Sequence, residues 1–197
     1  MHTKEDIVNS IKYFQMYLGE VLSYYQLNDA ICDFYDTTQG KFNEYGNCLG
    51  YISSALNYRQ HMLCYLLFYY DKDSKSIPRL INEIRDNRVL ADKELDHKLK
   101  NVALKMAAEL DSFHADIENL MEYRHNVYAH WNKKVFNDDW QTQFKKNHTI
   151  NYKNILLLCQ KCFEYFSDML IMMGEEPFVK SFINDFEIKH FISQLKR

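Results

Sequence analysis

The chain contains few of the residues that interrupt helices. Among its 197 residues, only five are glycine and two are proline. Sandwiches and barrels need frequent turns, and turns draw heavily on these two residues. No segment alternates between apolar and polar residues with the period of two that a half-buried strand requires. The sequence therefore argues against an all-β fold and favours long helices.

The chain also lacks a strong net charge. Lysine and arginine together number 24 against 27 aspartates and glutamates, which gives a formal net charge of −3. A protein that binds nucleic acid tightly and without sequence preference usually carries a broad basic field. The composition argues against that class but leaves room for a local basic site.

Long hydrophobic runs and a regular cysteine framework are missing as well. The longest apolar run, from Cys64 to Tyr70, is far shorter than the roughly 20 residues of a membrane-spanning helix. The five cysteines are odd in number and widely scattered, which does not suggest disulfides, and the N-terminus has no signal-peptide pattern. We therefore expect a cytoplasmic protein with no membrane segment.

The apolar residues, 47% of the chain, recur mostly at spacings of three or four, as on one face of a helix. Long helices are predicted over about 4–35, 44–70, 92–130 and 150–173, and shorter helices over about 77–85 and 179–195. The predicted caps are Thr3, Ser76, Asp92 and Thr149, with Gly174 ending the fourth long helix. The inner face of the second helix is predicted to contain Leu49, Ile52, Leu56, Leu63, Leu66 and Leu67.

These predictions define an all-α fold. We expect an up-and-down bundle of four or more long helices with short accessory helices. No linker is long enough to divide the chain and no internal repeat is visible, so residues 1–197 are expected to form one domain.

The predicted helix over 92–130 carries an apolar stripe that ends in polar residues. The stripe consists of Leu95, Leu99, Val102, Met106, Leu110, Phe113, Ile117 and Leu120. Its next position belongs to Arg124, and a core-facing arginine costs desolvation energy unless something pairs with it. His130, six residues later, is suited to proton transfer near neutral pH. The pair either has a structural role at the end of the helix or flanks a functional groove, about 9 Å apart along the axis.

The segment Arg124-His-Asn-Val-Tyr-Ala-His130 resembles the signature of HEPN domains, in which an arginine, a polar residue and a short gap precede a histidine near the end of a long helix. With Asp71-Lys-Asp-Ser and Ile77-Pro-Arg-Leu80 upstream, the resemblance covers roughly residues 50–170. It resembles the abortive-infection, AbiU2-like branch of this family.

This resemblance implies a HEPN-like bundle that forms a homodimer and brings two motifs into one cleft. It further implies a metal-independent endoribonuclease in phage defence or a toxin–antitoxin pair. Arg124 and His130 would be the motif residues, His125 would take the polar place, and Asn126 is an additional candidate. On a regular α-helix, Asn126 and His130 share a face and could form a hydrogen bond.

RNA cleavage suits these residue types. Attack by the 2′-hydroxyl on the adjacent phosphate needs a base, an acid and positive charge on the developing phosphorane. His130 could supply the proton transfers, and the planar guanidinium of Arg124 could hold two phosphate oxygens. Lys133, Lys134 and Trp131 could hold a single strand of RNA, unless they belong to an ordinary solvated loop.

Two other site types are weaker. Glu122-x-x-His125 and Glu187-x-x-His190 have the spacing of carboxylate di-iron sites, but Glu122 falls on the solvent side of the stripe. We therefore expect no metal and no cofactor. Cys159 and Cys162 have the spacing of a redox motif but lie inside a predicted helix, where they are better interpreted as core residues.

The competing functional class is a non-catalytic helical module. In this interpretation, Arg124 and His130 are structural or bind RNA or a nucleotide without cleaving it. The partner would be another protein, such as an antitoxin or a nucleotidyltransferase.

Overall fold

The computed structural model describes residues 3–37, 46–70, 75–129 and 150–178. Its elements are α1 (Lys4–Thr37), α2 (Gly46–Phe68), α3 (Ile77–Asp86), α4 (Lys93–Ser112), α5 (His114–Tyr123), the π-helical segment η1 (Arg124–Ala129) and α7 (Tyr152–Met172). These residues contain helices and no strand, which confirms the prediction of an all-α bundle. The helix expected over 179–195 and the loop expected over 132–148 lie outside the described residues.

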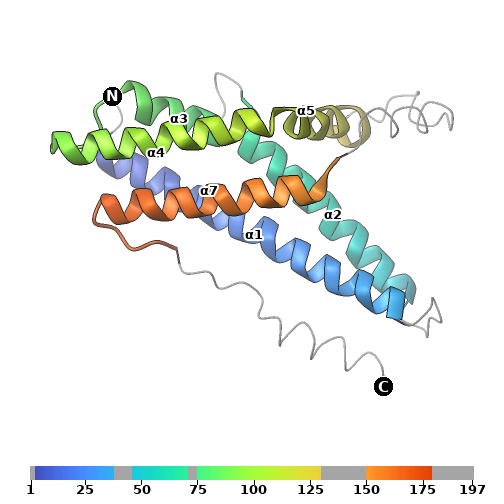
Figure 1. The fold of residues 1–197 in the computed structure, drawn as a ribbon. Helices are drawn as coiled ribbons and strands as arrows, with labels where there is room; N and C mark the ends of the chain where they lie inside the picture. Colours follow the sequence, from blue (N-terminus) through green and yellow to red (C-terminus); the bar gives the residue numbers. More distant parts are fainter. Residues whose placement is uncertain (1–2, 38–45, 71–74, 130–149, 179–197) are drawn as a thin grey trace.

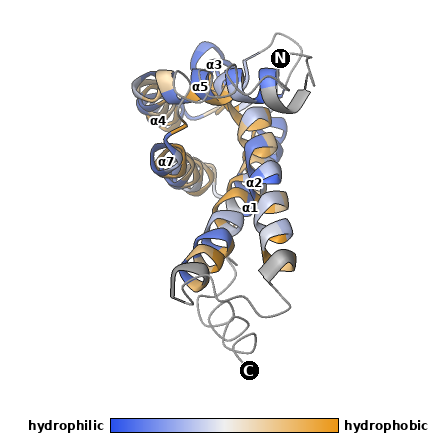
Figure 2. Cartoon of the chain, turned by 90° about the vertical axis from the view of Figure 1, so that its right-hand side faces the viewer, coloured by the Kyte–Doolittle hydropathy of each residue, from blue (hydrophilic) through white to orange (hydrophobic). Residues whose placement is uncertain are grey.

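The long helices pack in an up-and-down arrangement. α1 packs against α2 and α7, and α4 packs against α3 and α7. In Figure 1, α1 and the pair α4–α5 run in one direction, while α2 and α7 run back. Viewed from the end in Figure 2, α4 and α7 lie on one side of the molecule and α1 and α2 on the other. Within the part that is described, no helix is long and apolar enough to cross a membrane.

The core lies between these helices. Its fully buried side chains come from every long helix and include Leu18, Leu63, Leu99, Met106, Leu120 and Phe166. Leu99, Met106 and Leu120 belong to the predicted stripe of α4 and α5, so the stripe does face the core. The burial fixes these two helices against the bundle. It thereby determines the position of the motif, which begins directly after the C-terminal end of α5.

Several predicted helix ends are confirmed. The Thr3 hydroxyl accepts a hydrogen bond from the Asp6 amide at 3.2 Å, and Asp92 accepts from the amides of Glu94 and Leu95. At the end of α7, Gly174 adopts a φ of 74°, which is strained for any other residue. Its amide bonds back to the helix and that of Glu175 bonds to the Leu170 carbonyl, which completes a Schellman motif.

Other predicted details are wrong. Asn151, rather than Thr149, caps α7 by accepting from the Asn154 amide at 3.3 Å. Ser76 stands at the cap position of α3, but its hydroxyl makes no capping hydrogen bond. The expected continuous helix over 92–130 is interrupted at Phe113, which separates α4 from α5.

Three residues predicted to face inward are exposed. Leu95 on α4 is 37% exposed, while Ile52 and Leu66 on α2 are 38% and 55% exposed. Leu95 stands in the first turn of α4, where the bundle does not cover it. α2 is apolar on more than one side, so spacing alone does not determine which side its neighbours cover.

The buried stripe predicts that alanine substitutions at two leucines of α4 have very different effects on the free energy of unfolding. Leu99 is fully buried and Leu104 is 49% exposed. Leu99→Ala should lower the free energy of unfolding by about 2–5 kcal/mol because it leaves a cavity. Leu104→Ala should change it by no more than about 0.5 kcal/mol. Urea unfolding followed by circular dichroism measures both, and equal losses would contradict the assignment of the core.

Candidate functional site

The motif begins where the helix widens. Arg124 follows the last residue of α5, and its amide hydrogen-bonds to the carbonyls of Leu120 and Met121. From Arg124 to Ala129 the backbone is π-helical. Such segments are rare and often occur at functional sites. The predicted regular α-helix through residue 130 is therefore wrong over these six residues, and α-helical spacing does not relate their side chains.

The Arg124 side chain rests on an aromatic ring of a neighbouring helix. Its Cζ atom lies 4.2 Å from the centre of the Tyr65 ring of α2, a cation–π geometry. Its Nε atom is buried and has no hydrogen-bond partner within the described part of the chain. Among the same residues, no carboxylate forms an ion pair with it. The positive charge of Arg124 is thus held by a ring and not neutralised by any described acidic group.

The two residues after Arg124 differ in their surroundings. The Asn126 amide donates to the Glu122 carbonyl at 2.9 Å and to the Glu122 Oε2 at 2.8 Å. It therefore ties the first turn of η1 back onto α5. His125 is exposed to solvent. The other predicted site residues, which are His130, Trp131, Lys133 and Lys134, lie outside the described residues.

A histidine that the sequence did not single out lies close to the motif. His61 of α2 is buried, its Nδ1 lies 2.6 Å from the Asn57 carbonyl, and its Nε2 lies 2.6 Å from the Tyr152 hydroxyl. Its ring also stacks on that of Tyr123 at 5.8 Å between centres. Because Tyr123 directly precedes Arg124, this histidine joins α2, the end of α5 and the start of α7.

The hydrogen bonds of His61 suit the neutral ring. Nδ1 donates to the carbonyl, and Nε2 accepts from the Tyr152 hydroxyl. Burial lowers the pKa of His61, which also favours the neutral form. Only the spacing of His61 and Tyr65, four residues apart on one face of α2, could have indicated a shared contact surface. Their partners are too remote in sequence to give a local signal.

The three buried cysteines do not form a reactive site. Cys64, Cys159 and Cys162 are all buried. A hydrogen bond with Cys64 and burial raise the pKa of Cys159, and burial raises that of Cys162. Such thiols stay protonated and are poor nucleophiles and metal ligands. The interpretation of Cys159 and Cys162 as core residues is confirmed.

The glutamates that have the Glu-x-x-His spacing of a metal site either bond to another side chain or lie outside the described residues. Glu122 is bonded to Asn126, while Glu187 and His190 lie outside the described residues. In the ranges that the structure describes, no three histidine, cysteine or acidic side chains gather as metal ligands do.

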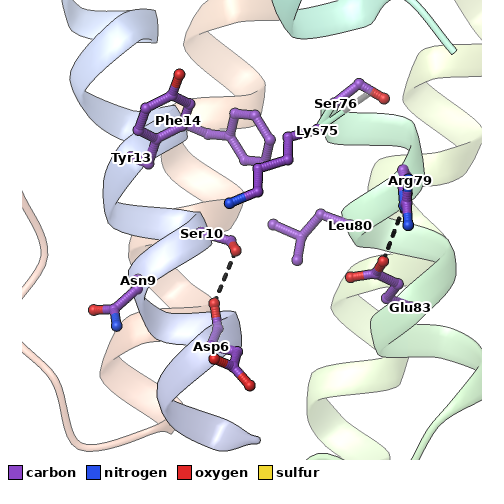
Figure 3. A pocket seen from close by; sticks show the side chains of 10 residues that line it. All are labelled: Asp6, Asn9, Ser10, Tyr13, Phe14, Lys75, Ser76, Arg79, Leu80 and Glu83. Atoms are coloured by element: carbon purple, nitrogen blue, oxygen red, sulfur yellow. Dashed lines mark hydrogen bonds and ion pairs between the residues drawn. The ribbon is translucent and has the colours of Figure 1, made fainter. Parts of the chain in front are cut away.

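A large cavity lies away from the motif. It has a volume of about 670 Å³ and is an open cleft between the first half of α1 and α3. Figure 3 shows Lys75 extending from the α3 side toward Ser10 of α1, while Arg79 pairs with Glu83 at 3.1 Å on α3 itself. None of its lining residues belongs to the motif or to the group formed by His61, Tyr123 and Tyr152. It therefore makes no contribution to the candidate site.

The fold and the motif together define a class of protein. The chain is a helical bundle in which Arg124 follows the end of α5. This arginine opens the segment Arg124-x-Asn126-x-x-Ala129-His130, and this is the organisation of a HEPN domain. The family model HEPN_AbiU2, described as AbiU2, matches residues 9–191. The chain therefore belongs to the AbiU2 family of HEPN domains. No curated protein and no solved structure matches it.

The buried neutral His61 predicts a pH-dependent stability. Its pKa in the folded chain lies below the ordinary value of 6.5, so between these two pKa values only the unfolded chain binds the proton. The contribution of His61 to the free energy of unfolding should therefore have its full value above about pH 6.5. The free energy of unfolding should fall as the pH drops below that value.

The prediction can be checked by urea unfolding at about pH 7.5 and about pH 5.5. His61→Gln should show a smaller loss between the two conditions than the unmodified chain. The matched control is His97→Gln, which changes an exposed histidine of α4. An unchanged pH dependence in His61→Gln would show that His61 does not titrate as its environment implies.

Proposed function

We propose that the chain is a metal-independent endoribonuclease of the HEPN type. It would cleave RNA by attack of a 2′-hydroxyl on the adjacent phosphate, at a site composed of two copies of the motif in a homodimer. Its setting would be phage defence by abortive infection or a toxin–antitoxin pair. The observation that carries the proposal is the environment of Arg124, at the start of a HEPN motif in a chain of the AbiU2 family.

The energetics of Arg124 favour a ligand over a purely structural role. A buried donor without a partner costs about 1–3 kcal/mol, and more when the group is charged. The contact with Tyr65 returns about 0.5–2 kcal/mol. The Nε donor stays unpaired and no acidic group neutralises the charge among the described residues, so an RNA phosphate on the two terminal nitrogens would compensate the positive charge. Local rules of stability are most often broken at functional sites.

The remaining roles follow from the motif. His130 would transfer protons, and a dimer would supply two such histidines, one as base and one as acid. The bond from Asn126 to Glu122 would hold the first turn of the motif, while the exposed His125 could contact RNA. Lys133, Lys134 and Trp131 would hold the strand. An antitoxin or a nucleotidyltransferase would be the protein partner that controls the activity.

A second candidate function is supported by the same contact. A guanidinium held on an aromatic ring can bind a phosphate without any proton transfer. The chain would then be a helical module that binds RNA, a nucleotide or a phosphorylated protein and does not cleave.

Cleavage assays separate these functions. Purified protein is incubated with single-stranded RNA in EDTA, beside Arg124→Ala, His130→Ala and the control Arg79→Ala, which changes an arginine paired with Glu83. We expect cleavage in EDTA with 2′,3′-cyclic phosphate ends. Each motif variant should lose about 100-fold or more of the rate, since general acid–base catalysis and charge stabilisation each contribute that much. Arg79→Ala should cleave like the unmodified chain.

Circular dichroism and light scattering show whether each variant keeps its fold and its oligomeric state. Folded motif variants that cleave normally would contradict the assigned site, and cleavage abolished by EDTA would contradict the metal-independent mechanism. RNA that is bound but never cut would favour the binding module.

A further inference from the structure

A second cavity lies next to the motif. It has a volume of about 390 Å³ and is formed by the end of α2 together with α3, α4 and α5. Two adjacent tyrosines line it, Tyr69 and Tyr70, which are 36% and 60% exposed. Its lining also includes the polar residue Asn82 and the apolar residue Met121. An aromatic wall with a few polar groups is typical of a small-ligand site.

Aromatic rings connect this cavity to Arg124. The Tyr69 ring stacks on the Tyr65 ring, with 4.6 Å between their centres and 19° between their planes. The Cζ atom of Arg124 lies 4.2 Å from the centre of the same Tyr65 ring. On α5, Met121 lies three residues before Arg124, about 4.5 Å along the helix axis. The cavity and the guanidinium are therefore neighbours along both α2 and α5.

The charges around the cavity do not favour a phosphate inside it. Arg85 is paired with Asp86 at 3.4 Å, and His114 lies 3.1 Å from Glu118. The carboxylate of Asp111 also lines the cavity. The Arg85 guanidinium is thus compensated and two further carboxylates lie nearby, so the cavity suits a neutral aromatic group, while the charge that no described acidic group neutralises lies outside it at Arg124.

We propose that this cavity is a nucleobase subsite for the RNA strand whose phosphate Arg124 contacts. The base stacks on the ring of Tyr70, the more exposed of the two tyrosines, and the Asn82 amide, which can both donate and accept, bonds to the edge of the base. This inference rests on the proposed function, because it takes RNA as the ligand of Arg124. It adds that the strand runs from the motif toward the C-terminal end of α2 and that an unpaired base is required.

A binding experiment tests the stacking directly. The ligand is a fluorescent single-stranded RNA octamer with 2′-O-methyl groups, which prevent its own attack on the phosphates, and binding is measured by anisotropy in EDTA. Tyr70→Ala should weaken binding about 5- to 150-fold, the equivalent of the 1–3 kcal/mol that stacking one base contributes. Tyr70→Phe keeps the ring and should bind within about threefold of the unmodified chain.

Two controls isolate the base. Tyr51→Ala removes a tyrosine that is 78% exposed near the start of α2, about 26 Å along the axis from the end of this helix at Phe68, and should leave binding unchanged. An octamer with abasic nucleotides keeps the phosphates but offers nothing to stack. The unmodified chain should bind it more weakly than the intact octamer, and Tyr70→Ala should cause no further loss.

The inference is overturned if Tyr70→Ala binds the intact octamer normally, or if it weakens binding to intact and abasic octamers equally. It is also overturned if the unmodified chain binds no octamer. Binding that depends on Tyr70 in a chain that never cleaves RNA would support the subsite and reject the nuclease. Cleavage together with binding that is independent of Tyr70 would reject the subsite alone.

Discussion

The contact between Arg124 and Tyr65 is the interaction on which the candidate site depends. It places a cation at the end of an apolar stripe, on the ring of a neighbouring helix, with its Nε atom buried and unpaired among the described residues. A cation–π contact offsets only part of the cost of removing a guanidinium from water. The site therefore combines a firm position for Arg124 with a positive charge that no described acidic group neutralises, which suits the binding of an anion.

The surrounding structure keeps this arrangement in place. Burial of the α4 and α5 stripe fixes the helix that ends at the motif, and the change to a π-helix at Arg124 begins as soon as that stripe ends. On the α2 side, His61 bonds to Tyr152 and stacks on Tyr123, so the start of α7 is tied to the same place. Three helices thus meet around the arginine through aromatic rings and one neutral imidazole, without a described ion pair.

Much of this fold could be predicted from local signals. Apolar spacing located every described long helix, and the caps at Thr3, Asp92 and Gly174 follow from the chemistry of single residues. The interruption at Phe113 and the π-helix at Arg124 could not be predicted, because both depend on how the helix meets its neighbours. Spacing also does not show which side of an apolar helix is covered, and for that reason the prediction that Leu66 faces inward is wrong.

The candidate site was predictable only in part. The position of Arg124 on the stripe indicated correctly that it leans against the bundle, but its partner Tyr65 lies on another helix, 59 positions earlier in the printed sequence. His61 is similarly remote in sequence from Tyr123 and Tyr152, so its spacing of four from Tyr65 on α2 is the one local signal for it. The sequence also predicts roles for His130 and the lysines after it, which remain predictions because those residues are not described.

The most direct measurement is the free energy of unfolding of Arg124→Met. Methionine keeps an unbranched side chain that can still pack on Tyr65 but removes the charge and the unpaired donor. If Arg124 is held for a ligand, its replacement should leave stability unchanged or raise it by up to about 2 kcal/mol, as stabilising changes at strained functional sites do. A loss of about 3–5 kcal/mol, typical of breaking a buried ion pair, would contradict this account and make Arg124 a structural residue.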